Sequence, residues 1–275
     1  MSSTRATNRD EIILAHVKRH GLGLEIGPAH APIAPKAAGF HVHVLDHASR
    51  EQLIEKYREH GVDLTKIEPV DFIWDGRPFP ELVGRTCTYD WIIASHVIEH
   101  STDLVGFLND CDALLKSDGV LSLAIPDMRW CFDHFRAPSS LGRVIDAAQT
   151  GRRAHSAGSA AEYFLDVVQK GGRLGWSKGE TGEYALRHSV GEAKRAMTEK
   201  TAYLDIHEWC FTPTSFRLLV RDLLDLELIQ LKELAFHPTS GHEFYVTLSR
   251  GGERPPQARL EMLQQIANEL AERAQ

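Results

Sequence analysis

The sequence predicts an α/β fold: a doubly wound, mostly parallel sheet of seven strands with a terminal antiparallel hairpin and a helical insert. Over residues 20–126, short apolar runs that end in acidic or glycine residues alternate with amphipathic segments. This alternation is typical of parallel strands joined by helices. It stops over residues 127–211 and returns over 212–250, so we expect one domain that carries an insert.

The composition is that of an ordinary globular protein and excludes several classes of function. Of the 275 residues, 43% are hydrophobic and 25% are charged, and the net charge is -7. There is no basic block of the kind that binds nucleic acid, and no apolar run long enough to span a bilayer. The four cysteines form no CxxC pair, so we expect neither disulfides nor a thiolate metal site, and we expect a reducing, cytoplasmic location.

The first predicted strand, residues 22–26, follows a lead-in helix expected over 11–20. It contains Glu25 near its end and stops at Gly27-Pro28. Nucleotide-binding sheets commonly begin with a buried strand that ends in an acid and a glycine turn. Gly27 has no Cβ, so the backbone can approach a ligand closely there.

The second predicted strand, residues 41–46, alternates polar and apolar residues and ends in Asp46. Asp46 follows the first turn by about 20 residues, which is the spacing of a carboxylate that binds a ribose. The alternative is that Asp46 is the N-cap of the helix expected over 49–60.

The third predicted strand, residues 68–74, closes with Asp75-Gly76. Trp74 and Asp75 lie where an adenine ring would need an apolar face and an acceptor for its amino group. The alternative is an ordinary strand end followed by an Asp-Gly turn.

The remaining elements follow in order. The very apolar strand over 89–95 is expected at the centre of the sheet. Pro213 suits the first turn of a helix, and a tight His-Pro-Thr-Ser-Gly turn suits a hairpin. The predicted ranges are a helix over 104–115, a strand over 120–125, no clear strand over 127–211, a helix over 212–226, strands over 226–236 and 242–249, and an amphipathic helix over 257–274.

Five blocks occur in a fixed order: LEIGP, VHVLDH, DFIWDG, YDWIIASHVIEH and LLKSDGVLSLAIPD. In these blocks and in its terminal hairpin, over residues 20–126 and 212–250, the chain resembles class I S-adenosylmethionine-dependent methyltransferases of the type 11-like group. The segments IPDMRWCFDHFR, RHS and DIHEWCFTPTSF resemble a bacterial subgroup associated with glycosyltransferases and surface polysaccharides. The resemblance implies S-adenosylmethionine as cofactor and a saccharide or other small hydroxyl compound as acceptor. Glycosyltransferases are candidate partners, and homo-oligomerisation stays open.

The resemblance also assigns cofactor-binding roles. Glu25, Gly27 and Pro28 would face the amino-acid part, Asp46 the ribose, Trp74, Asp75 and Gly76 the adenine, and Ser95 and His96 the methionine part. Glu99 and His100 either belong to this region or only order the next helix. The loop after Gly27 lacks the further glycines usual in the family, but this cofactor has no phosphates that would need them.

Methyl transfer to a hydroxyl needs a base, and histidine titrates near neutrality. The candidates are Asp127, Asp133, His134, His188 and His207. We rank His207 first, then His134 and Asp127, because the chain returns from the insert to the sheet at His207. Alternation places Asp205, His207 and Trp209 on one face, so Asp205 is expected to orient the imidazole and Trp209 to form a wall. The alternative is that His207 only ties the insert to the core.

Three functions and several roles stay open at this stage. The protein is an O-methyltransferase, a non-catalytic cofactor-binding scaffold in a glycan-assembly complex, or a nicotinamide dehydrogenase, and the missing GxGxxG disfavours the last. Asp and His could hold a divalent metal, but no tight ligand spacing appears and none is predicted. Trp130, Tyr163, Trp176 and Trp209 either stack on sugars or belong to the core.

The expected organisation is a cofactor-binding half over 1–126, a helical lid over 127–211, the end of the sheet domain over 212–250 and a terminal helix over 251–275.

Overall fold

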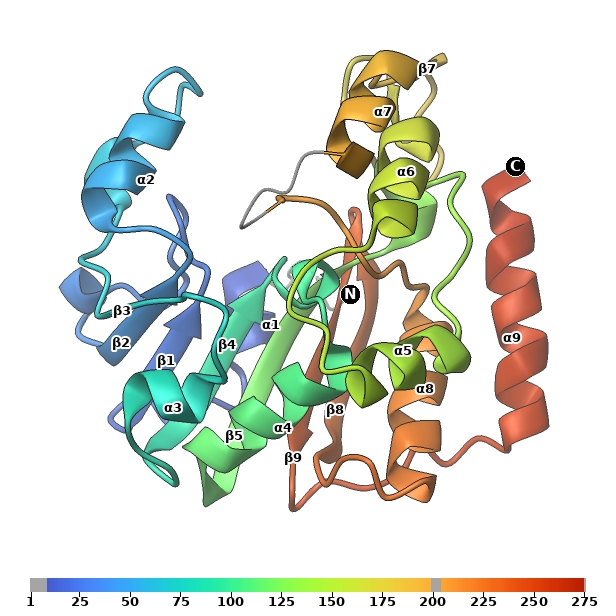
Figure 1. Cartoon of the computed structure of the whole chain (residues 1–275). Coiled ribbons are helices and arrows are strands. Elements are labelled where there is room, and N and C mark those ends of the chain that lie inside the picture. Colours follow the sequence, from blue (N-terminus) through green and yellow to red (C-terminus); the bar gives the residue numbers. More distant parts are fainter. Residues whose placement is uncertain (1–8, 199–203, 275) are drawn as a thin grey trace, which may run out of the picture.

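The computed structural model describes residues 9–198 and 204–274. Its centre is a seven-stranded sheet with the order β3-β2-β1-β4-β5-β9-β8 (Figure 1). The strands are β1 (Leu22–Ile26), β2 (His41–Asp46), β3 (Phe72–Ile73), β4 (Tyr89–Ser95), β5 (Leu115–Pro126), β8 (Lys232–Ser240) and β9 (Glu243–Ser249). The first five are parallel, and β9 runs antiparallel to both β5 and β8. The predicted fold class is confirmed.

Strand β4 divides the core into two apolar clusters. Successive side chains of a strand point to opposite faces, so Ile92 and Ala94 join one cluster while Trp91 and Ile93 join the other. Because both faces are covered, β4 is apolar throughout its buried part. The helices are α1 (Arg9–Leu14), α2 (Arg50–Tyr57), α3 (Phe79–Val83), α4 (Leu104–Leu114), α5 (Leu141–Gln149), α6 (Ala157–Asp166), α7 (Val190–Thr198), α8 (Pro213–Asp225) and α9 (Arg259–Ala271).

The strand order reverses between β1 and β4, which are neighbours in the sheet but are separated in sequence by β2 and β3. At such a switch point the connections leave in opposite directions, and a crevice opens at the carboxyl ends of the strands. Short 3₁₀ turns continue the chain at this edge, among them η3 (Ile98–His100) after β4 and η4 (Met128–Trp130) after β5.

In the described part of the insert, 127–198 and 204–211, the helices are α5, α6 and α7, and a small hairpin is also present. The hairpin pairs β6 (Val168–Lys170) with β7 (Tyr184–Leu186), so the prediction of no strand over 127–211 was wrong. Three-residue strands are too short for an alternating pattern to be recognised. Figure 1 shows α6, α7 and β7 beyond one end of the main sheet.

Several boundaries differ from the prediction. Strand β3 has two residues instead of seven, because before it the Asp71 carboxylate accepts the Val44 N–H at 2.8 Å in place of a regular ladder. Strand β5 begins at Leu115 and includes the expected Asp118-Gly119 turn. Strand β8 begins at Lys232 and continues to Ser240, so the hairpin turns at Gly241, whose φ is +67°. In the described part of the chain, no helix combines the length and apolarity needed to cross a membrane.

Candidate active site

One cavity of about 560 Å³ lies at the carboxyl ends of β1, β2 and β4. Its volume is in the range of sites that hold drug-sized ligands. One part of its wall comes from the first half of the sheet, including Gly27, Asp46, Trp74, Gly76 and His96. Another part comes from the insert, including Phe132, Arg152, Arg153, Asp205 and His207.

The turn after β1 is tight, and Gly27 makes it so. Gly27 has a φ of +63°, and its N–H donates to the Leu45 carbonyl at 2.8 Å. A Cβ at this position would come within 2.8 Å of the Val97 side chain. The glycine is therefore required by both backbone conformation and space.

Asp46 ends β2 in the wall of the cavity. One carboxylate oxygen accepts the Ala29 N–H at 3.1 Å and the other the His47 N–H at 2.7 Å. The N-cap of α2 is Ser49, whose hydroxyl accepts the Gln52 N–H, so the N-cap alternative for Asp46 was wrong. Oδ1 also lies 2.7 Å from His47 Nδ1, so Asp46 orders the loops around the cavity and keeps a further lone pair on Oδ2 for a ligand.

The nine residues predicted to bind the cofactor separate into two groups. Gly27, Asp46, Trp74, Gly76 and His96 line the cavity, while Glu25, Pro28, Asp75 and Ser95 are outside the described lining. Glu25 accepts the N–H groups of Ile33 and Ala34 at 2.6 and 3.1 Å. The Ser95 hydroxyl accepts a hydrogen bond from Arg9 at 2.6 Å, and Asp75 pairs with Arg77 at the surface.

His207 is the one cavity-lining residue among the five base candidates. Its Nδ1 lies 2.5 Å from Asp133 Oδ2. Arg136 donates to Asp133 Oδ1 at 2.8 Å and to the His207 carbonyl at 2.9 Å. Although burial acts to raise it, His207 and Arg136 hold the pKa of Asp133 well below its usual range. An ionised Asp133 therefore accepts the Nδ1 proton and leaves Nε2 as the acceptor.

Asp133, and not Asp205, orients His207. The Asp205 carboxylate instead lies 3.2 Å from His100 Nδ1 and accepts a hydrogen bond from Lys56 at 3.1 Å. Alternation failed here because an orienting partner 74 residues away in sequence gives no local signal. The predicted wall residue Trp209 is fully buried, and its indole donates to the Ser101 carbonyl at 2.6 Å.

The other base candidates are held in place away from this cavity. Asp127 is fully buried and accepts hydrogen bonds from Arg129 and the Thr239 hydroxyl. His134 lies 2.6 Å from the Arg129 carbonyl and stacks on Tyr184. His188 Nδ1 is 3.4 Å from Glu192.

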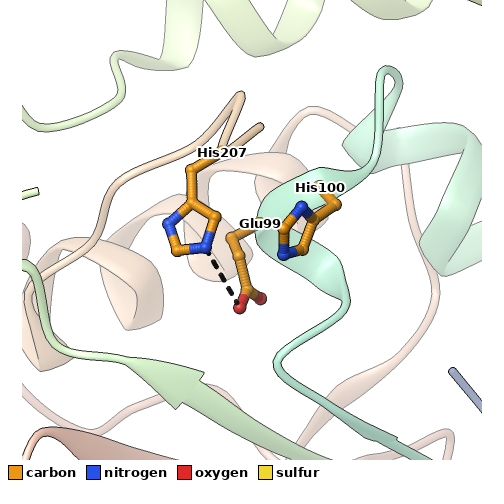
Figure 2. Close-up of side chains that lie close together, drawn as sticks. All are labelled: Glu99, His100 and His207. Carbon is orange, nitrogen blue, oxygen red and sulfur yellow. Dashed lines mark ion pairs between the residues drawn. The ribbon is translucent and has the colours of Figure 1, made fainter. Parts of the chain in front are cut away.

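Glu99 and His100, left open by the sequence, join His207 in space. The Glu99 side chain is 1% exposed, and its Oε1 lies 3.8 Å from His207 Nε2 (Figure 2). The same oxygen lies 3.7 Å from His96 Nδ1. The rings of His100 and His207 have centroids 4.6 Å apart. Burial raises the pKa of Glu99 to about 7.

His96 has a φ of +53°, which is rare for a residue with a Cβ. Its Nε2 lies 2.8 Å from Glu243, which also accepts a hydrogen bond from Arg9. Although burial acts to raise it, these two partners lower the pKa of Glu243 to about 2. Strained backbone is often retained at functional sites, and here it turns His96 into the cavity wall.

Many lining residues were not anticipated from the sequence, among them Lys56, Phe132, Arg152 and Arg153. Adjacent arginines were the one available signal, but arginines on a loop are usually solvated surface residues.

Comparison with known proteins identifies the fold. No family model matches the chain, and no curated protein matches it. A candidate Zn-dependent alcohol dehydrogenase from Rhodobacter sphaeroides is 14% identical with a TM-score of 0.50, covering 90% of this chain and 91% of its own.

Two methyltransferases are also similar. A SAM-dependent methyltransferase from Methanosarcina mazei is 14% identical with a TM-score of 0.45, and the match covers 88% of this chain and 98% of that protein. The Burkholderia thailandensis 1,6-didemethyltoxoflavin-N1-methyltransferase, solved with S-adenosylhomocysteine, is 14% identical with a TM-score of 0.43. The match covers 87% of this chain and 75% of that protein. These likenesses concern the fold alone. The strand order and the antiparallel β9 are those of a doubly wound α/β sheet that ends in an antiparallel hairpin.

Glu25 gives a prediction about pH. Burial raises its pKa from the ordinary value of 4.5 to about 7, so the folded state binds a proton that the unfolded state releases. The stability that this proton contributes is present below about pH 4.5 and is lost as the pH rises through 7. As the pH rises between these values, the free energy of unfolding of the wild type should fall by on the order of 2–3 kcal/mol relative to that of Glu25→Gln.

Urea denaturation of both proteins across this pH range measures the difference. Glutamine removes the titration and keeps one acceptor oxygen, so a constant offset between the proteins is expected in addition. Parallel pH profiles would show that Glu25 is ionised in the folded protein throughout.

Proposed function

We propose that the protein is an S-adenosylmethionine-dependent methyltransferase that acts on a hydroxyl group. The observation that carries the proposal is one cavity that joins Asp46, at the carboxyl edge of the sheet, to the His207–Asp133 pair. A methyltransferase needs this arrangement, because the methyl donor and the group that activates the acceptor must share one enclosed space. The open cavity favours catalysis over a scaffold, in which this space would be filled.

The residues on the sheet side fit the cofactor. Asp46 offers its remaining lone pair to a ribose hydroxyl, and Trp74 with Gly76 lies where the adenine would be placed. The Gly27 turn is left for the amino-acid part. Bound S-adenosylmethionine supplies a methyl group whose bond to sulfur breaks as its bond to the acceptor oxygen forms, leaving a neutral thioether.

On the other side of the cavity, His207 Nε2 accepts the proton of the acceptor hydroxyl. Asp133 stabilises the imidazolium that results, and Arg136 fixes both Asp133 and the His207 backbone. A base placed in this way contributes about 10²–10⁴-fold to rate.

We propose a saccharide or another small hydroxyl compound as the acceptor. The support is the resemblance of three segments to glycan-associated methyltransferases, together with the polar wall that Lys56, Arg152 and Arg153 supply. Trp130 and Trp176 are 7% and 3% exposed and pack with Val168, which favours a core role over sugar stacking. Residues 127–211 would act as a lid, because Phe132, Arg152 and Arg153 come from this segment. Glycosyltransferases as partners remain part of this proposal.

Replacing Asp46 tests the cofactor site. Asp46→Ala removes charged acceptors and should weaken S-adenosylmethionine binding at least tenfold, about 1.4 kcal/mol. Asp146→Ala, on the exposed face of α5, is the matched control and should bind as the wild type does. Isothermal titration calorimetry gives both affinities. Equal affinity of the Asp46 variant and the wild type would remove Asp46 from the site.

Replacing His207 tests the catalytic side. In His207→Ala, turnover should fall about 10²–10⁴-fold while cofactor affinity stays near the wild-type value. The melting temperature should fall by less than the loss of turnover requires, because buried Asp133 loses its imidazole partner but keeps Arg136. The control His20→Ala removes an exposed histidine and should leave turnover unchanged. Transfer of label from S-adenosylmethionine to a panel of sugar acceptors measures turnover. Normal turnover in His207→Ala would exclude this residue, and a matching loss of folded protein would favour a structural role.

A further inference from the structure

The Glu99 carboxylate is the least satisfied acidic group in the cavity region. Neither of its oxygens has a hydrogen-bond partner among the residues that the structure describes, although the side chain is buried. Burying a carboxylate without a partner is costly, so such a group is protonated, ion-paired or bound to a cation. Three imidazoles, those of His96, His100 and His207, are its neighbours, and all three line the cavity.

Glu99, His100 and His207 each present one donor atom, and these atoms lie within 4.8 Å of one another. Figure 2 shows a ring nitrogen of each histidine turned toward the Glu99 carboxylate. Two imidazoles and one carboxylate form a common ligand set for divalent transition metals.

A carboxylate lies behind each histidine; the one behind His207 is hydrogen-bonded to its ring, whereas the one behind His100 is close without forming a hydrogen bond. Nδ1 of His207 lies 2.5 Å from Asp133, and Nδ1 of His100 lies 3.2 Å from Asp205. Carboxylates in this position fix the ring orientation of metal-binding histidines and make the other nitrogen a better ligand. The arrangement leaves Nε2 of each ring for a ligand.

The backbone holds the three residues together. The Glu99 carbonyl accepts the N–H groups of Glu208 and Trp209 at 2.8 and 3.1 Å, which fixes His207 beside η3. The site therefore joins the end of β4 to the segment that leaves the insert.

We propose that Glu99, His100 and His207 bind a divalent cation, and that the cation takes a hydroxyl oxygen of the acceptor as a further ligand. The two imidazole ligands favour zinc over magnesium and calcium, and the carboxylate ligand also suits manganese. Donor atoms that each lie about 2.1 Å from a zinc ion are about 3.4 Å from one another. Side-chain rotations that move each donor atom by roughly 1 Å would therefore bring the three atoms to this spacing. The cation would neutralise Glu99 and face the cavity.

The role of the acceptor hydroxyl as a ligand rests on the proposed function. The binding of the cation by Glu99, His100 and His207 does not. The one lone pair of His207 Nε2 serves either a proton or the cation, so the two roles exclude one another. In the cation-bound protein, the cation lowers the pKa of the coordinated hydroxyl, and the proton passes to solvent instead of to His207.

The test begins with binding. The full chain, stripped with a chelator and desalted, is titrated with zinc chloride and with manganese chloride by calorimetry. The wild type should bind one equivalent of zinc or manganese that Glu99→Gln does not bind. The affinity of this site should be at least tenfold higher than that of any binding left in Glu99→Gln. The control His20→Ala should bind as the wild type does. Identical isotherms for the wild type and Glu99→Gln, with both proteins folded by thermal melting, would overturn the inference.

The second readout is methyl transfer with and without chelator. Loss of transfer in chelator and its recovery with zinc or manganese supports the cation site, and Glu99→Gln should not recover. Full transfer in chelator overturns the inference while the proposed function stands. Specific cation binding without any methyl transfer supports the site and contradicts the proposed function.

Discussion

The site depends on the contact between the Glu99 carbonyl and the backbone N–H groups of Glu208 and Trp209. This contact joins the turn after β4 to a segment more than a hundred residues later in the chain. It places His207 next to His100, whose ring centroid is 4.6 Å from that of His207, at the wall of the cavity. Arg136 strengthens the junction, because its guanidinium donates to both Asp133 and the His207 carbonyl. The charges of the site are thus placed by buried backbone and side-chain hydrogen bonds, which are costly to break.

The sheet was predictable because its signals are local. Apolar runs with acids at their ends gave the strands, and the edge at which Asp46 and His96 lie follows from parallel strand direction. Glu25 shows the limit of this reasoning: it is in the predicted place, but its carboxylate turns to the N–H groups of Ile33 and Ala34. A sequence pattern predicts the strand or helix on which a residue lies, but it does not show which neighbouring group the side chain will hydrogen-bond.

The catalytic side was only partly predictable, because its partners are distant in sequence. His207 was ranked first for its place where the insert ends, and the cavity includes it. Its orienting carboxylate is Asp133, from the other end of the insert, and the nearer Asp205 pairs with His100 and Lys56. Asp127 was expected at the ligand edge, but the guanidinium of Arg129 occupies its carboxylate. Such pairings depend on how the insert folds back, and no local spacing records them.

The same fold carries many chemistries, so the assignment depends on what the cavity binds. The most direct measurement is a crystal structure of the protein with S-adenosylhomocysteine. The account predicts the ligand in the cavity at the carboxyl ends of β1, β2 and β4, with a ribose hydroxyl hydrogen-bonded to Asp46 and the sulfur facing the space next to His207. A cavity that excludes this ligand, or one that binds NAD in its place, would contradict the account.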